Sequence, residues 1–179
     1  MTEHIYTSND DKIITDEEQA IIVEWTRQNY KTFNSTGFNR QMQVLARYNK
    51  DYVPACIWDI KQRIVNKENL HDFKQEPIFK DAIGYMTDGG QLHEHTDPNP
   101  TDSNLIHTRF NVYVQIPEKG GLPIYNNKLC SLKEGTYVCC VSGRDKHYCQ
   151  KVEGPRERIV LSFGFLLPPQ RVEHVKYMY

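Results

Sequence analysis

The sequence lacks the features of a membrane-spanning, secreted or nucleic-acid-binding chain. No apolar run approaches the ~20 residues that cross a bilayer, and the start, Met1-Thr2-Glu3-His4, is polar, with no apolar signal core. Lys and Arg number 22 against 23 Asp and Glu, so no basic excess predicts a nucleic-acid partner. The cysteines are odd in number and show no spacing typical of zinc sites or disulfide frameworks: Cys56, Cys130, Cys139, Cys140 and Cys149. We therefore expect a soluble, cytoplasmic protein with no membrane or nucleic-acid partner.

A chain of 179 residues has the length of one domain with its own core. Its composition changes near residue 78, and we expect a single domain over 1–179. In this interpretation 1–77 is mainly helical support, 78–167 is a strand-rich core, and 168–179 is a C-terminal tail. Helices first and strands afterwards predict the α+β class.

Two helices are predicted in the first part. Thr15 and Glu18 form a capping-box pattern that starts a helix running to about Tyr30. Pro54 suits the first turn of a second helix. The segment Asn34–Gly37 is predicted to be a loop, and Gln41–Tyr48 fits either a strand or a short helix.

From Ile78 onward, short runs rich in Val, Ile, Tyr and Phe alternate with Gly, Pro and Asn, the pattern of short strands. Several short strands at this density predict a sandwich or jelly roll. The polar segment from Pro98 to His107 is expected to form a loop. The predicted strands are Ile78–Thr87, Leu92–His95, Arg109–Ile116, Pro123–Tyr125, Gly135–Val141 and Arg158–Leu167.

His95 and Asp97 stand two positions apart, so on a strand both side chains point to one face. With a distant third ligand, for which His147 is the best candidate, they would form the set of two histidines and one carboxylate that binds non-haem Fe(II). His93 shares the face of His95 on a regular strand. A His-x-His pair in a cupin-like site is therefore an alternative, although a place near the pocket edge fits His93 better.

Arg158 opens the apolar run Ile159–Phe163, and a buried guanidinium needs an anion. Ser162 falls on the same strand face as Arg158. Arg156 is the alternative cation. A further strand presents polar side chains on one face, and these are additional candidates for the site: Arg109, Asn111 and Tyr113.

The ordered set of Tyr85, His95, Asp97, His147, Arg158 and Ser162 resembles the Fe(II)- and 2-oxoglutarate-dependent oxygenases, within them the prolyl-hydroxylase-like group. The resemblance covers Ile78 to Leu166 and includes the Gly120-Gly121 turn. It implies a double-stranded β-helix (jelly roll) with N-terminal helices packed on one sheet. It also implies that His95, Asp97 and His147 hold Fe(II), and that Arg158, with Ser162 and Tyr85, binds 2-oxoglutarate.

The resemblance implies a dioxygenase that uses Fe(II), 2-oxoglutarate and O2 to hydroxylate an unactivated C–H bond. A prolyl or other side chain in a peptide or protein is the first expectation for the substrate. A free amino acid or other small molecule is the alternative. A different class, a non-catalytic jelly-roll or cupin-like binding module, also fits the strand pattern.

Overall fold

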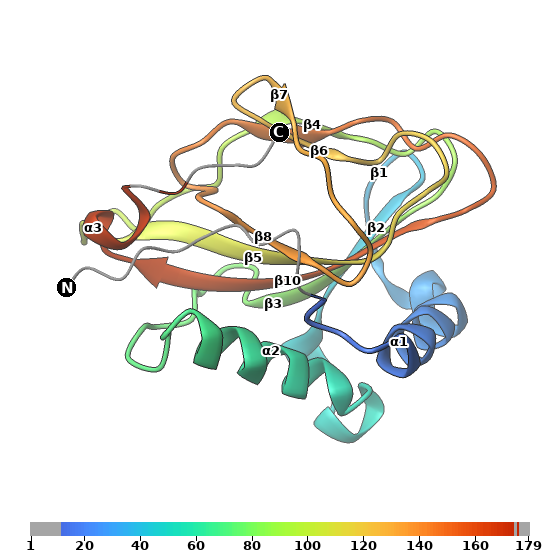
Figure 1. The fold of residues 1–179 in the computed structure, drawn as a ribbon, viewed down its shortest axis with the longest axis horizontal. Coiled ribbons are helices and arrows are strands. Elements are labelled where there is room, and N and C mark those ends of the chain that lie inside the picture. Colours follow the sequence, from blue (N-terminus) through green and yellow to red (C-terminus); the bar gives the residue numbers. More distant parts are fainter. Residues whose placement is uncertain (1–11, 174, 176–179) are drawn as a thin grey trace.

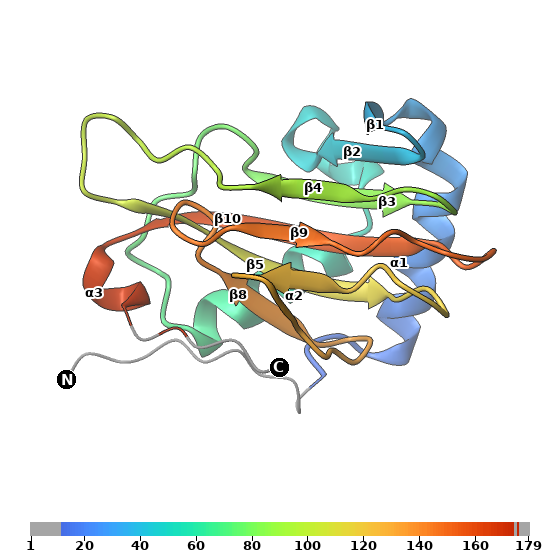
Figure 2. The same cartoon turned by 90° about the horizontal axis from the view of Figure 1, so that it is seen from above.

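The computed structural model describes residues 12–173 and 175, which form two facing antiparallel sheets with helices outside the larger one (Figure 1). The larger sheet has the order β1-β2-β3-β10-β5-β8 and the smaller one the order β4-β9-β6-β7. The larger sheet consists of β1 (Asn34–Gly37), β2 (Arg40–Val44), β3 (Asp81–Met86), β10 (Arg158–Leu167), β5 (Ile106–Gln115) and β8 (Tyr137–Cys140). The smaller sheet consists of β4 (Leu92–His95), β9 (His147–Cys149), β6 (Pro123–Tyr125) and β7 (Lys128–Leu129). Figure 2 shows the strands of the smaller sheet lying over those of the larger one. This arrangement is consistent with the expected jelly roll.

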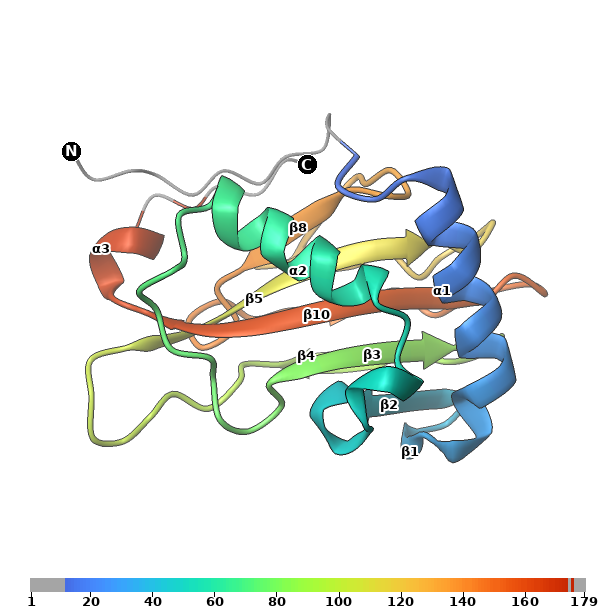
Figure 3. The same ribbon diagram turned by 90° about the horizontal axis from the view of Figure 1, so that it is seen from below.

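Helices α1 (Asp16–Asn29) and α2 (Cys56–Lys67) cover the outer face of the larger sheet (Figure 3). Thr15 caps α1 through the predicted capping box, since its side chain accepts from the Glu18 N–H while the Glu18 carboxylate accepts from the Thr15 N–H. The remaining helical elements are short: η1 (Tyr30–Thr32), η2 (Leu45–Arg47), η3 (Lys50–Tyr52) and α3 (Pro169–Val172). Among the described residues, no helix is both long and apolar enough to cross a membrane.

The inner face of α2 joins the helix layer to the sheet. Ile57, Ile60 and Ile64 are completely buried and belong to one hydrophobic core with residues of β3, β5 and β10. Full burial of one such side chain contributes about 1.5–3 kcal/mol. The helices therefore hold the larger sheet from outside and leave its other face to the cavity between the sheets.

Two expectations for the first part need revision. The segment Asn34–Gly37 is strand β1 rather than a loop, pairing only with β2 at the edge of the sheet. All four of its residues are exposed, so the strand carries no apolar alternation that the sequence could reveal. Gln41–Tyr48 contains both of the elements considered, because β2 ends at Val44 and the helical turn η2 follows directly.

Candidate active site

Three side chains from two distant segments of the chain meet between the sheets. His95 ends β4 and His147 begins β9, and the two residues are direct partners across the strand pair. Their ring centroids lie 4.2 Å apart. Asp97 follows β4, and one ligand atom from each of the three residues lies within 4.8 Å of the others. The structure therefore brings together the three residues that the sequence predicts to be metal ligands.

Both imidazole rings are oriented by the backbone. Nδ1 of His95 lies 2.8 Å from the carbonyl oxygen of His93, and Nδ1 of His147 lies 3.0 Å from that of Asp145. A carbonyl only accepts, so each Nδ1 carries the hydrogen, and each Nε2 has a lone pair for a metal when its ring is neutral. A protonated His95 would instead donate from Nε2 to the Asp97 carboxylate, whose Oδ1 lies 3.5 Å away. The backbone position of Asp97 is fixed by its N–H, which donates to the carbonyl of Ser142 at 2.8 Å.

The charges of the three residues also suit a divalent metal. Burial raises the pKa of Asp97, but the hydrogen bond from His95 and the charges of His107 and His147 outweigh it, and the pKa lies well below its usual range. Burial lowers the pKa of His147. The hydrogen bond to Asp97 raises the pKa of His95. An ionised carboxylate with two imidazoles is the donor set that suits Fe(II) and leaves positions open, so these residues fit the ion that the resemblance implies.

His93 does not join this group. Its side chain is exposed, and only its carbonyl contacts His95. The pairing of β4 with β9 is irregular between Leu92 and His95, and both of these residues line the cavity although they are three positions apart. The break in alternation turns the His93 side chain away, so the His-x-His alternative finds no support in the geometry.

A cavity of about 360 Å³ extends from His95, Asp97 and His147 across the inner face of the larger sheet. Arg158 lies in its wall and is only 7% exposed. Its Nε donates to the carbonyl of Gly121 at 2.7 Å, and its Nη2 lies 3.4 Å from the hydroxyl of Tyr113. The guanidinium also lies 5.3 Å from the centre of the Tyr113 ring.

No ion pair balances Arg158 within the described part of the chain. Burial raises the pKa of Tyr113 to about 12, so the hydroxyl beside the guanidinium stays neutral. A buried cation without an anion is costly, and the cavity is the open side on which an anion can be bound. The turn before β6 supports this arrangement, because Gly121 has a φ of +69° and a Cβ there would meet Pro117 at 2.5 Å.

Ser162 lines the same cavity, but its hydrogen bonds are not to Arg158. Its hydroxyl donates to the side-chain oxygen of Asn111 at 2.5 Å and accepts from Nε of Arg109 at 2.7 Å. Arg109 and Asn111 also line the cavity, as expected from their shared strand face. Ser162 lies four residues along β10 from Arg158, about 13 Å at the usual rise of a strand. It therefore belongs to the opposite end of the cavity.

Two residues predicted near the cosubstrate lie elsewhere. Tyr85 faces the helices, where its ring stacks on Tyr30 at 4.6 Å and its hydroxyl lies 3.4 Å from the Glu157 carboxylate. Its strand neighbours Gly84 and Met86 point into the cavity instead, so the expectation that Tyr85 contacts the cosubstrate is not met. Arg156 also points away and pairs with the carboxylate of Glu134 at 2.6 Å. The choice between the two arginines therefore favours Arg158.

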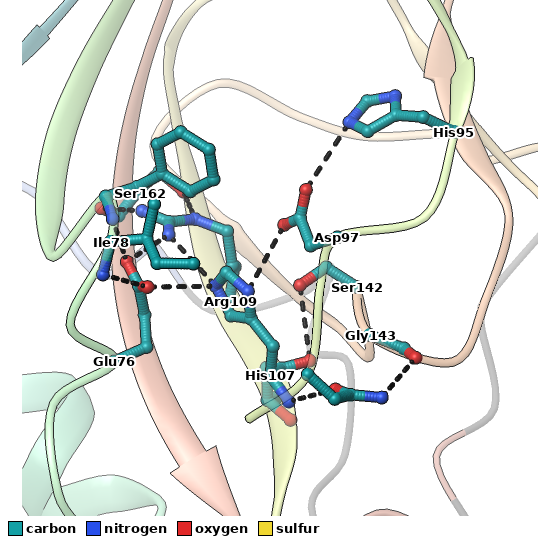
Figure 4. A network of polar contacts seen from close by, with 12 residues as sticks. Glu76, Ile78, His95, Asp97, His107, Arg109, Ser142, Gly143 and Ser162 are labelled. Carbon is teal, nitrogen blue, oxygen red and sulfur yellow. Dashed lines mark hydrogen bonds and ion pairs between the residues drawn. The ribbon is translucent and has the colours of Figure 1, made fainter. Parts of the chain in front are cut away.

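The sequence interpretation missed a buried polar network behind Asp97, drawn in Figure 4. Nδ1 of His107 lies 3.7 Å from Oδ2 of Asp97, and its Nε2 lies 3.7 Å from the Glu76 carboxylate. Nη1 of Arg109 contacts that carboxylate at 2.9 Å and Nε2 of His107 at 3.2 Å. Glu76 and His107 are each only 1% exposed. The network supports the side of Asp97 that faces away from His95.

The sequence interpretation also missed Arg40, which reaches the cavity from β2. No local pattern marks it, because Arg40 precedes the predicted element at Gln41–Tyr48 and faces the cavity only when β2 pairs with β3.

No family model matches the sequence, and none of the curated proteins compared with it matches. Solved structures do match. The viral collagen prolyl hydroxylase vCPH from Paramecium Bursaria Chlorella virus-1, in complex with 2OG, is 14% identical with a TM-score of 0.61, over 88% of this chain and 93% of that one. A prolyl-4-hydroxylase from Pseudomonas putida is 17% identical with a TM-score of 0.57, over 90% and 91%.

HygX from Streptomyces hygroscopicus, with nickel and 2-oxoglutarate bound, is 9% identical with a TM-score of 0.62, over 90% of this chain and 83% of that one. The likenesses span nearly the whole chain at low identity. The chain therefore shares its fold with these two prolyl hydroxylases and with HygX.

Proposed function

We propose that this protein is an Fe(II)- and 2-oxoglutarate-dependent dioxygenase that hydroxylates an unactivated C–H bond. The observation that carries the proposal is the meeting of His95, Asp97 and His147 in a cavity that also holds the unbalanced guanidinium of Arg158. A metal-binding trio alone would fit many proteins. A trio that shares its cavity with a buried cation fits a cosubstrate with a chelating keto acid at one end and a carboxylate at the other.

When bound, Fe(II) supplies the redox chemistry that couples oxidation of 2-oxoglutarate to hydroxylation. The substrate C–H, 2-oxoglutarate and O2 become the C–OH, succinate and CO2, which balances atoms and electrons. The protein itself supplies ligation, orientation and exclusion of water. His95, Asp97 and His147 leave positions open for the cosubstrate and for oxygen. Arg158 orients the diacid because its planar fork matches a carboxylate.

Apolar side chains complete the cavity wall. Met86, Leu92 and Val160 line the same cavity as the trio and the arginine. Their surfaces exclude water from the hydrophobic part of the diacid and strengthen the electrostatic contacts at each end. No side-chain general base is needed, because the substrate C–H bond is broken by oxidation rather than by proton transfer.

Two substrate classes enter this proposal. The first is a prolyl or other side chain of a peptide or protein, in line with the fold shared with two prolyl hydroxylases. The second is a free amino acid or other small molecule. The net charge of −1 gives no reason to add a nucleic acid.

The test is succinate formation. Protein loaded with Fe(II) without oxygen should release succinate from 2-oxoglutarate once O2 is admitted, and the His147→Ala variant should not. Arg158→Gln should raise the KM for 2-oxoglutarate about tenfold or more, the loss expected for a charge-assisted hydrogen bond. Arg156→Gln is the matched control, since that arginine points away from the cavity, and its KM should stay within twofold of the wild-type value. A wild-type protein that binds no metal and forms no succinate would instead be a binding module.

A further inference from the structure

A second arginine faces the cavity beside Arg158. Arg40 on β2 is the direct partner of Met86 on β3, and Met86 is the direct partner of Arg158 on β10. The three residues therefore form a row across the sheet, with neighbouring strands about 4.8 Å apart, and all three line the cavity. Two guanidinium groups flank one methionine on the same face.

Like Arg158, Arg40 has no acidic partner in the described part of the chain. Its side chain donates one hydrogen bond, from Nη1 to the carbonyl of Thr36 at 3.2 Å. Burial lowers the pKa of Arg40, and the charge of Arg158 lowers it further. Two cations that repel each other and have no carboxylate nearby are the arrangement expected of an anion-binding site without its anion.

The charges of the cavity indicate how many anions it receives. Asp97 is the one acidic residue among the described lining residues, and Arg109 is neutralised by its ion pair with Glu76. The cavity with a divalent metal bound therefore has a net charge of +3, because the metal, Arg40 and Arg158 bring four positive charges and Asp97 brings one negative charge. 2-Oxoglutarate brings two negative charges, so one positive charge remains for the substrate.

The size of the cavity indicates a small substrate. Its volume of about 360 Å³ lies at the lower end of the range of ligand pockets and must also hold the cosubstrate. Arg158 is almost completely buried, whereas Arg40 is partly exposed on β2 near the edge of the sheet. The diacid can therefore pair with the inner arginine while Arg40 stays accessible to a second molecule.

We propose that Arg40 recognises the substrate, and that the substrate is a small carboxylate-bearing molecule of the size of a free amino acid. This inference rests on the proposed oxygenase function and narrows its substrate class. A charge-assisted hydrogen bond to a carboxylate contributes more than a neutral one. Replacing that carboxylate with an amide should remove most of the recognition.

The first test measures binding without turnover. Protein loaded with Mn(II) and 2-oxoglutarate, without oxygen, is heated with a pool of free L-amino acids or with the matching pool of L-amino acid amides. The free acids should raise the melting temperature and the amides should not. Equal shifts from both pools, or no shift from either, would overturn the inference.

The second test uses Arg40→Gln, with Arg47→Gln as the control because Arg47 is exposed and lies outside the cavity lining. Arg40→Gln should weaken binding of the free acids about tenfold or more, and Arg40→Lys should restore part of it. Affinity for 2-oxoglutarate should change less than twofold in Arg40→Gln. A parallel loss of 2-oxoglutarate affinity would assign Arg40 to the cosubstrate and overturn the inference.

Turnover separates the two proposals. If the wild-type protein forms no succinate under any condition, the oxygenase function itself fails. If it forms succinate, and only a prolyl peptide blocked at both ends raises the rate, the oxygenase function stands and the carboxylate-bearing small substrate is wrong. If the free acids raise the rate and the amides do not, both proposals are supported.

Discussion

The ion pair between Glu76 and Arg109 predicts a large stability loss from a nearly isosteric change. Glu76 is 1% exposed, and its carboxylate accepts from the N–H groups of Ile78 and Phe79 at 2.8 and 2.7 Å. Arg109 also donates to the carbonyls of Lys80 and Ser162, each at 3.0 Å. Glu76→Gln keeps the shape and one acceptor oxygen but leaves the Arg109 charge buried without a counter-ion.

Removing one partner of a buried ion pair costs about 3–5 kcal/mol. That is a large share of the 5–15 kcal/mol by which domains are stable, so we expect Glu76→Gln to lower the free energy of unfolding by about 3 kcal/mol or more. The assay is equilibrium unfolding in urea at pH 7, with the slope checked for two-state behaviour.

The double variant with Arg109→Met provides the control. It removes both charges, so its loss should be smaller than the sum of the two single losses, with a coupling of about 1–3 kcal/mol. A Glu76→Gln loss below about 1 kcal/mol, or strictly additive losses, would refute the interpretation of the network as a charge-balanced unit.

Three further predictions concern the same region and the core. His107→Ala should weaken Mn(II) binding about 10–100-fold, as loss of a group that orients a ligand does, because His107 supports Asp97; unchanged affinity by titration would contradict this. The hydrogen bond to Asp97 raises the pKa of His95. Because a protonated imidazole cannot bind metal, Mn(II) affinity should fall as the pH drops through that raised pKa. An affinity that is independent of pH between 5 and 8 would count against His95 as a ligand. Burial raises the pKa of Glu68, whose side chain accepts from the Tyr137 hydroxyl, so its stabilising contribution is present below the unfolded pKa and lost as the pH rises through the folded pKa. The melting temperature of Glu68→Gln should therefore rise relative to that of the wild type between pH 4 and pH 7. A difference in melting temperature that stays constant over this range would refute the assignment.

The sequence could predict that His95, Asp97 and His147 lie together because their signal is local and chemical. His95 and Asp97 are candidates by residue type and spacing, and His147 is a candidate because no other suitable histidine follows. Arg158 is predictable for a similar reason, since a cation at the start of an apolar run needs an anion. These inferences do not depend on the detailed pairing of the strands.

The face on which Tyr85 lies could not be predicted. Five of the six residues of β3 are buried, because helices cover one face and the smaller sheet covers the other, so hydrophobic alternation carries no signal there. The exposed position of the His93 side chain could not be predicted for a different reason, the irregular pairing of β4 with β9. Periodicity assumes a regular strand, and an irregularity turns side chains without leaving a mark in the sequence.

Three residues near His95, Asp97 and His147 could not be predicted from the sequence, because each takes its role from contacts between distant segments. Glu76 lies in the connection between α2 and β3, His107 lies on β5, and Arg40 lies on β2. None of them stands in a motif with another, and their roles come from contacts between distant segments. Single polar residues of this kind are indistinguishable from surface residues until the strands are paired.

A crystal structure of the protein with Mn(II) and 2-oxoglutarate, grown without oxygen, tests the central claim most directly. We predict one metal ion bound by Nε2 of His95, Nε2 of His147 and a carboxylate oxygen of Asp97, with the far carboxylate of the diacid on the Arg158 guanidinium. A metal bound elsewhere, or a diacid whose far carboxylate makes no contact with Arg158, would contradict the oxygenase assignment.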